Sequence, residues 1–259
     1  MHLRLITRRT LFMGGVDVRR ARRLVRLLPR YANDLRTFRR ATRRAGDAAL
    51  PLGVIFPIVT DRVASAGDTD GPYFTQDLWA ARKIHAAAPA RHVDIGSRID
   101  GFIGHLLVFR EVEVIDIRPL SSAVEGLTFR QEDATSLSSI PDRSIESLSS
   151  LHAVEHFGLG RYGDPLDPLA CFTAMAALAR VLAPGGTLYF SVPVGHERVE
   201  FNAHRILDPH RVIRSFGDLD LVTFDLIDDA GTLHLDADPD HAATQNEATG
   251  LFVFTRPRA

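Results

Sequence analysis

Three acidic residues follow three successive short apolar segments of the sequence. Asp94 lies in the first segment, Asp116 ends the second about twenty residues later, and Asp133 follows the third. In a doubly wound sheet, ligands bind at the edge where the carboxyl ends of neighbouring parallel strands meet. A carboxylate there can accept hydrogen bonds from a ribose diol, and another can reach the exocyclic amine of a base. The spacing therefore predicts a nucleoside site.

The turn after the first apolar segment supports the same interpretation. A glycine lets the backbone approach a ligand closely, and the helix that follows offers free N–H groups. Each glycine or aspartate taken alone is also compatible with an ordinary loop or capping residue. Besides the three acids, we assign to the cofactor site the turn and the residues next to the later strand ends: Gly96, Ser97, Arg98, Asp100, Gly101, Ile117, Ala134, Leu151 and His152.

Short apolar runs alternate with amphipathic stretches, and this alternation implies parallel strands with right-handed crossovers. The predicted fold is α/β: a Rossmann-like, doubly wound, mostly parallel seven-stranded sheet with an N-terminal helical arm. We expect an arm at 1–50, a connecting loop and helix at 51–90 that pack on the core, and the sheet domain at 91–259. Strands are expected at 92–95, 112–116, 127–130, 144–150, 187–192, 219–227 and 251–255, and helices at 76–87, 102–109, 168–182 and 209–216.

Residues 90–256 resemble the class I methyltransferases that use S-adenosyl-L-methionine (SAM). The segment 94–96 is similar to their first motif, Asp116 to the acid that binds ribose, and Asp133 to the acid beside adenine. Residues 179–188 are similar to the segment that leads into their fifth strand. The resemblance implies SAM as cofactor and methyl transfer as the activity.

Four stretches also resemble the DUF268 family of uncharacterised proteins, which often accompany glycan-assembly genes. Arg98 and Asp100 occupy positions that are glycine in the usual methyltransferase motif. A nucleotide-binding protein of altered or absent activity on the same fold is therefore the alternative. The four stretches that resemble DUF268 are residues 73–80, 92–98, 149–164 and 191–195.

The segment 152–156 reads His-Ala-Val-Glu-His and supplies the candidate catalytic groups. A neutral imidazole at His156 can take a hydroxyl proton near neutral pH, with Glu155 orienting it. A structural, hydrogen-bonded role for His156 is the other interpretation. The same letters match the H-x-x-E-H pattern of zinc hydrolases, but that pattern lies within a helix, whereas this segment directly follows a predicted strand. We predict no metal site.

Polar residues after the fourth and fifth predicted strands form the expected acceptor side. Such residues suit a polyhydroxylated or anionic molecule, although a solvated loop would have the same composition. We therefore expect O-methylation of a glycan or another hydroxylated small molecule. The residues assigned to this side are Arg161, Tyr162, Glu197, Asn202, His204 and Arg205.

The charge of the chain is concentrated at its beginning. Residues 1–44 hold fourteen arginines and two aspartates, whereas the whole chain has a net charge of -1. A basic amphipathic helix there can lie on an anionic membrane or pack on the domain. The arginines lack interleaved aromatic residues, so we expect no nucleic-acid partner. With one cysteine and no apolar run long enough to cross a bilayer, we expect a cytoplasmic protein, with the inner membrane face as a possible contact.

Overall fold

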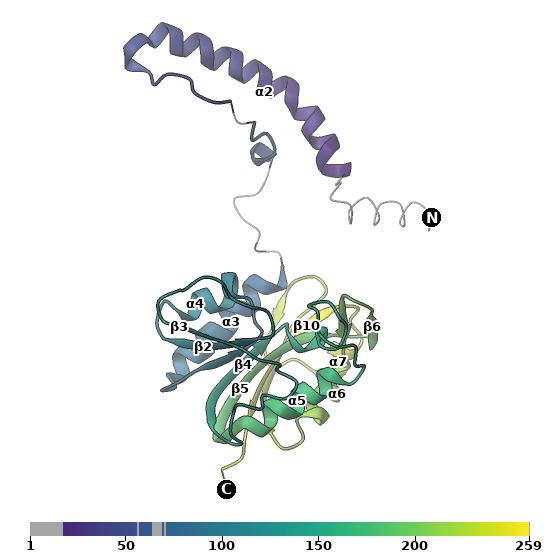
Figure 1. Cartoon of the computed structure of the whole chain (residues 1–259). Coiled ribbons are helices and arrows are strands. Elements are labelled where there is room, and N and C mark those ends of the chain that lie inside the picture. Colours follow the sequence, from purple (N-terminus) through teal and green to yellow (C-terminus); the bar gives the residue numbers. More distant parts are fainter. Residues whose placement is uncertain (1–17, 56, 64–68, 70, 259) are drawn as a thin grey trace. The chain divides into compact units, whose positions relative to one another are not determined.

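A computed structural model describes residues 18–55, 57–63, 69 and 71–258 of the chain. It divides into two compact units, residues 1–68 and residues 69–259 (Figure 1). The first unit contains the 28-residue helix α2 (Val18–Ala45), followed by the short 3-10 turns η1 (Gly46–Ala48) and η2 (Asp61–Val63). None of the described helices combines the length and the apolar character needed to cross a membrane.

The second unit is built on one eight-stranded sheet in the order β3-β2-β1-β4-β5-β10-β8-β9. The first five strands pair in parallel, and β10 is antiparallel to both β5 and β8. The predicted α/β class is confirmed. The strands are β1 (Val93–Ile95), β2 (Val112–Asp116), β3 (Leu127–Gln131), β4 (Ile145–Leu151), β5 (Leu182–Val194), β8 (Asp220–Ile227), β9 (Leu233–His234) and β10 (Ala248–Thr255).

The two-residue edge strand β9 is one strand more than the seven predicted. It forms because the loop after β8 turns back at Asp228, whose carboxylate accepts the backbone N–H of Thr232 and lies 2.7 Å from Nε2 of His234. A separate hairpin, β6 (Arg198–Glu200) with β7 (His204–Ile206), was also not predicted. It follows β5 and lies beside the turn after β4.

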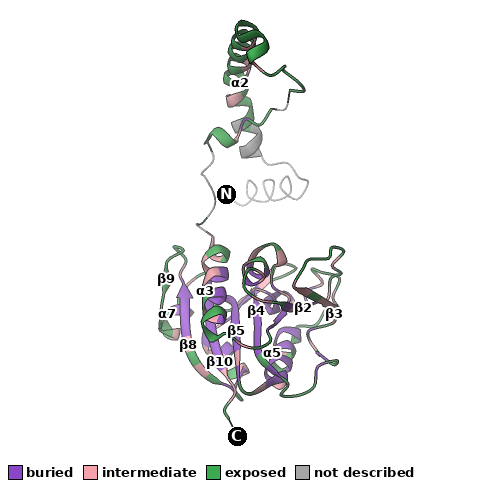
Figure 2. Cartoon of the chain, turned by 90° about the vertical axis from the view of Figure 1, so that its left-hand side faces the viewer, coloured by how far each residue is buried: buried purple, intermediate pink, exposed green. Residues whose placement is uncertain are grey.

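Helices cover both faces of the sheet, and the strands between them are buried (Figure 2). Because side chains alternate across a strand, the strands β2, β4, β5, β8 and β10 contribute to two apolar clusters. One cluster contains α5 and α6, and the other contains α3, η3 and α4. The helical elements are α3 (Pro72–Ala87), the π-helical turn η3 (Ile99–Ile103), α4 (Gly104–Leu106), the 3-10 turn η4 (Val154–His156), α5 (Ala170–Val181), α6 (Pro209–Ser215) and α7 (Pro239–Ala243).

A buried carboxylate ties α3 to the far half of the sheet. The indole N–H of Trp79 donates to Asp225 of β8 at 2.6 Å. Lys83 lies 3.5 Å from the same carboxylate, and the backbone N–H of Asp236 donates to it at 2.9 Å. Since Asp225 is only 2% exposed, these partners replace the water that its charge would otherwise require.

Trp79→Phe keeps an aromatic ring in place but removes the donor to the Asp225 carboxylate. We expect a loss of about 2 kcal/mol in the free energy of unfolding, because hydrogen bonds to buried charged groups are among the strongest. Urea unfolding followed by circular dichroism measures it. Arg82→Ala, at an exposed position of the same helix, is the control and should change stability by less than about 0.5 kcal/mol. Equal stability of Trp79→Phe and wild type would show that the hydrogen bond from Trp79 to Asp225 does not stabilise the fold.

Candidate functional site

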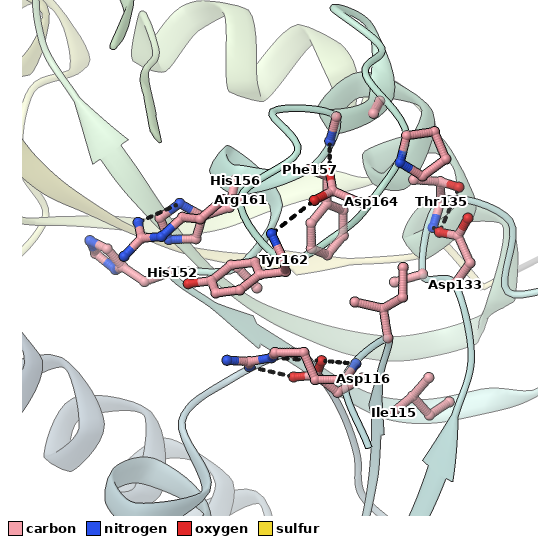
Figure 3. Close-up of a pocket in the computed structure, with 18 of the residues that line it drawn as sticks. Ile115, Asp116, Asp133, Thr135, His152, His156, Phe157, Arg161, Tyr162 and Asp164 are labelled. Atoms are coloured by element: carbon pink, nitrogen blue, oxygen red, sulfur yellow. Dashed lines mark hydrogen bonds and ion pairs between the residues drawn. The ribbon is translucent and has the colours of Figure 1, made fainter. Parts of the chain in front are cut away.

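The carboxyl ends of the parallel strands surround a cavity of about 300 Å³ (Figure 3). Gly96 follows β1, Asp116 ends β2, Asp133 follows β3, and His152 follows β4. The loop 157–167 forms the opposite wall. The volume lies at the lower end of the range for small-molecule sites, and the position is that expected for ligands of doubly wound sheets.

Half of the predicted site residues line this cavity: Gly96, Arg98, Asp116, Ile117, Asp133, Ala134, His152, His156, Arg161 and Tyr162. The structure therefore gathers residues from positions that are far apart in the sequence. The other predicted residues lie behind the wall or outside it. These are Asp94, Ser97, Asp100, Gly101, Leu151, Glu155, Glu197, Asn202, His204 and Arg205.

Asp94, which was predicted to contact the ligand, instead lies beneath the turn. Its carboxylate accepts the backbone N–H of Ser97 at 3.0 Å and the Ser97 hydroxyl at 2.7 Å, and it also accepts the Ser149 hydroxyl. Complete burial raises the pKa of Asp94 to about 6, although these hydrogen bonds lower it. Ser97 in turn accepts the backbone N–H of Leu151. Asp94, Ser97 and Leu151 thus hold the turn in shape.

Asp116 and Asp133 do share one hollow, as predicted. The Asp116 carboxylate accepts three hydrogen bonds from Arg118, from the backbone N–H and from two guanidinium nitrogens, at 2.6 to 3.0 Å. Asp133 accepts the backbone N–H and hydroxyl of Thr135. Gly96, which directly follows β1, adopts a φ of +73°, and a Cβ added there would lie 3.0 Å from the Cβ of Ala153. The turn therefore needs glycine.

Arg98 and Asp100, at the positions of the usual motif glycines, pair with each other at the rim. Two guanidinium nitrogens of Arg98 lie 3.3 Å from the Asp100 carboxylate, and the guanidinium lies 5.5 Å from the ring centre of Tyr73. Asp100 is exposed and does not line the cavity. Gly101 does not line the cavity either, and a Cβ there would lie 2.7 Å from the Asp77 carboxylate. Gly101 serves the packing of α3.

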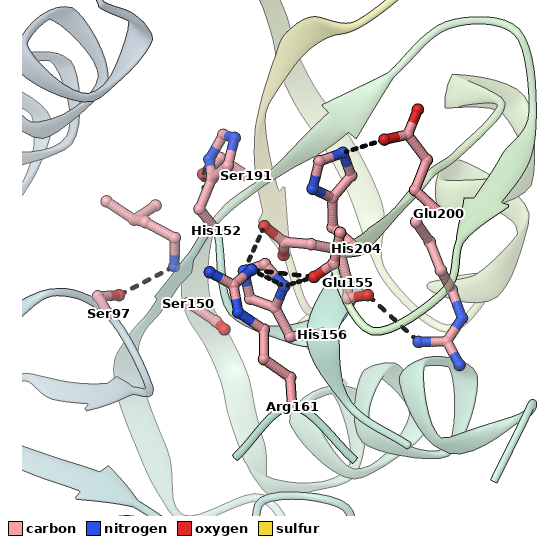
Figure 4. A network of polar contacts seen from close by, with 12 residues as sticks. Ser97, Ser150, His152, Glu155, His156, Arg161, Ser191, Glu200 and His204 are labelled. Atoms are coloured by element: carbon pink, nitrogen blue, oxygen red, sulfur yellow. Dashed lines mark hydrogen bonds and ion pairs between the residues drawn. The ribbon is translucent and has the colours of Figure 1, made fainter. Parts of the chain in front are cut away.

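His156, the predicted base, has both ring nitrogens directed at the protein (Figure 4). Its Nδ1 lies 2.7 Å from the carbonyl oxygen of Ala203 and therefore carries the proton. Its Nε2 lies 3.5 Å from Oε1 of Glu155. Burial lowers the pKa of His156 to about 4 and raises that of Glu155 to about 8, so both are neutral near pH 7. Neither carboxyl oxygen of Glu155 has a hydrogen-bond partner among the described residues.

His152 is better placed to act on a ligand. Gln76 donates its amide N–H to Asp77, so its carbonyl oxygen faces His152 and accepts the Nδ1 proton. This leaves Nε2 of His152 unprotonated and without a hydrogen-bond partner among the residues that the structure describes. Burial lowers its pKa to about 3. His152 also has a φ of +48°, an uncommon backbone conformation that is often found at functional sites.

Sequence reasoning missed Gln76 and Tyr73 of α3 as site residues. Tyr73 lines the cavity, with its ring centre 5.1 Å from that of His152. Gln76 also accepts the hydroxyl of Ser191 at 2.6 Å. The available signal was the stretch 73–80, which carries part of the DUF268 resemblance but was assigned to the connecting segment.

Four of the predicted acceptor residues do not line the cavity. Arg205 is 4% exposed and donates to the carbonyl oxygens of residues 155, 157, 167 and 168, so it braces the loop from behind. Glu197 pairs with Arg211, and Asn202 donates to the carbonyl of Leu159. His204 lies 3.0 Å from Glu247. Arg161 and Tyr162 remain at the cavity.

The arrangement does not support zinc binding by the segment 152–156. The turn η4 begins at Val154, so His152 lies outside it and the two histidines do not share a helical face. Within the described ranges, the one group whose ligand atoms lie within 4.8 Å of one another is Glu200, His204 and Glu247. Both glutamates of that group are exposed.

Known structures share this fold. The [4+2]-cyclase SpnF has a TM-score of 0.51 at 13% identity, covering 70% of this chain and 82% of that chain. The N-methyltransferase NodS from Bradyrhizobium japonicum WM9 has a TM-score of 0.50 at 17% identity, covering 73% of this chain and 98% of that chain. The chain thus has the fold of the class I SAM-dependent methyltransferases. At these identities the likeness establishes the fold alone.

The match to a sequence family covers a shorter part of the chain than the structural matches do. Residues 134–250 match the family described as "Caenorhabditis protein of unknown function, DUF268". The predicted DUF268 resemblance is thereby confirmed over this stretch, which runs from the end of β3 into β10. No curated protein matches the chain in sequence.

The burial of the Glu155 carboxyl, which raises its pKa, predicts a pH dependence of stability. Folded Glu155 keeps its proton up to about pH 8, whereas the unfolded chain releases it near 4.5. The unfolded state therefore binds fewer protons between these values, and stability falls as pH rises. The lowered pKa values of His152 and His156 act in the opposite direction, but below about pH 6.5. Glu155 consequently dominates above pH 7.

We expect the wild type to lose roughly 1 kcal/mol of unfolding free energy between pH 7 and pH 8 because of Glu155. Glu155→Gln retains the shape and a donor toward His156 but cannot ionise, so this part of the slope should disappear. Urea titrations at closely spaced pH values measure the difference. An unchanged slope in Glu155→Gln would show that the carboxyl is already ionised at neutral pH.

Proposed function

We propose that this protein is a SAM-dependent methyltransferase that methylates a hydroxyl group of a sugar, a glycan or another hydroxylated small molecule in the cytoplasm. The observation that carries the proposal is the convergence of Asp116 and Asp133 on one cavity beside the Gly96 turn. This is the arrangement that a nucleoside ligand requires.

The residues present fit an adenosyl cofactor. Asp116 is held at the end of β2 with its carboxylate at the cavity, and a carboxylate can accept about four hydrogen bonds, one more than Arg118 donates. Asp116 would hold the ribose, and Asp133 with Ala134 would hold the base. Gly96 and Arg98 would contact the amino-acid end. When bound, SAM supplies an electrophilic methyl group.

His152 is the base that this geometry favours, in place of His156. Gln76 holds the proton on Nδ1, so Nε2 can accept a proton from a hydroxyl bound in the cavity. Its lowered pKa keeps the ring neutral throughout the physiological range, although it makes the ring a weak base. Most of the rate enhancement would therefore come from holding the reactants in line.

Polar groups on the cavity wall support a hydroxylated acceptor. Arg161, Tyr162 and Asp164 line the side formed by the loop after β4. Asp164 is already engaged by the backbone N–H groups of Gly158 and Tyr162, whereas the Tyr162 hydroxyl has no hydrogen-bond partner among the described residues. A few convergent polar groups on a mostly apolar wall are typical of sites that orient small molecules.

A second candidate function is catalysis or binding without methyl transfer. The ion pair between Arg98 and Asp100 replaces two motif glycines, and the [4+2]-cyclase SpnF shows that the fold also occurs in an enzyme named for a different reaction. The two proposals differ in whether a methyl group leaves the cofactor.

Asp116→Ala tests the nucleoside site. We expect titration calorimetry with S-adenosylhomocysteine to show binding to the wild type and a loss of at least roughly 30-fold in the variant, because the hydrogen bond that the ribose diol would donate to the carboxylate is removed. Glu125→Ala, an exposed acidic position outside the cavity, is the matched control and should bind as the wild type does. If neither SAM nor S-adenosylhomocysteine binds the wild type, the proposal fails.

His152→Asn tests the base, because asparagine tolerates the left-handed backbone of this position. The assay measures transfer of the tritium-labelled methyl group of SAM to a panel of mono- and disaccharides. We expect this transfer to fall by roughly 100-fold or more, with little change in S-adenosylhomocysteine affinity. His156→Asn is the comparison and should retain more transfer. Loss of transfer in His156→Asn alone would return the role of base to that residue.

A further inference from the structure

The helix α2 of the first unit carries an unusual concentration of positive charge. It contains eleven arginines and one acidic residue, Asp34. That aspartate is itself paired with Arg62, at 2.7 Å. The arginines of the helix whose side chains are described form no ion pair with a described carboxylate. Such a surface attracts a polyanion.

The opposite side of α2 is apolar and largely uncovered. Leu24, Leu28 and Phe38 are 40%, 42% and 59% exposed, and they lie along one side of the helix because their spacings are close to whole numbers of helical turns. Arg22 and Arg26 are about half a turn away, on the polar side. An exposed apolar stripe on a helix is unfavourable in water unless something covers it.

The segment that follows α2 covers only one flank of the helix. Ile58, Val59 and Arg62 share a hollow with Leu27 and Tyr31, and both of these helix residues are partly buried. The segment itself adds further exposed apolar side chains. These are Leu50, Leu52, Val54, Ile55 and Ile58, with exposures from 42% to 96%.

We propose that α2 and residues 50–58 bind the surface of a membrane rich in anionic lipid. The apolar stripe would enter the boundary between headgroups and acyl chains, and the arginines beside it would contact lipid phosphates. A nucleic acid would satisfy the charge but leave the apolar side chains in water. Charge complementarity together with exposed apolar residues therefore favours lipid. This proposal does not depend on methyl transfer.

The full-length protein can be tested by flotation with vesicles of phosphatidylcholine, alone or with 30% phosphatidylglycerol. We expect binding only to the anionic vesicles, and weaker binding as salt increases. Each arginine near an anionic surface contributes a factor of about five in affinity, so a triple substitution should weaken binding roughly 100-fold. The basic variant combines Arg22→Gln, Arg26→Gln and Arg30→Gln.

A second variant keeps the charge and removes the apolar stripe. Leu24→Ser, Leu28→Ser and Phe38→Ser together should weaken vesicle binding at least roughly tenfold, since the affinity for the membrane increases with the apolar area that is buried in it. The control removes the same number of exposed charges from the second unit, where binding should not change. It combines Arg82→Gln, Arg143→Gln and Arg214→Gln.

Three results would overturn the proposal. These are equal binding to neutral and anionic vesicles, an apolar variant that binds as the wild type does, and a concentration-dependent dimer in analytical ultracentrifugation that the apolar variant abolishes. The last would show that a second copy of the chain covers the stripe. S-adenosylhomocysteine affinity measured on the same variants separates this test from that of the cavity, because the arm variants should leave it unchanged.

Discussion

The buried carboxyl of Asp94 is the interaction on which the geometry of the cavity depends. It holds Ser97 by two hydrogen bonds and Ser149 by another, and Ser97 in turn accepts the backbone N–H of Leu151. These bonds join the turn after β1 to the end of β4, so the Gly96 turn and the backbone at His152 are fixed relative to each other.

Several buried side chains around the cavity are neutral, whereas the side chains at its rim are charged. Among the buried groups, His152 and His156 in the cavity wall and Glu155 behind it are kept neutral at neutral pH by burial, and hydrogen bonds to backbone or amide oxygens fix the tautomers of the histidines. At the rim, the half-exposed guanidinium groups of Arg118 and Arg98 are paired with carboxylates. Neutral side chains beside the cavity limit the electrostatic cost of enclosing the uncharged part of a ligand.

The sequence was sufficient to predict the sheet and part of the site. Short apolar runs fix strand positions, and an acid at the end of such a run must lie at the ligand edge, as Asp116 and Asp133 do. It was not sufficient to separate Asp94 from these two, because a serine three residues later can turn a carboxyl inward. Gln76 could not be predicted either, since its contact with His152 spans 76 residues and depends on how α3 packs. Likewise, Gly101 looks like a ligand-side glycine until the position of Asp77 is known.

The loop after β4 is held by its backbone more than by its side chains. A Cβ on Gly158 would lie 2.0 Å from the carbonyl oxygen of Asp167. Arg205 donates hydrogen bonds to the carbonyl oxygens of Phe157 and Asp167, at the two ends of the loop. The side chain of Tyr162 lines the cavity, and no hydrogen bond from it to the described residues supports this frame. Relatives of this protein could therefore exchange that side chain, and with it the molecules they accept, while the main chain keeps its course.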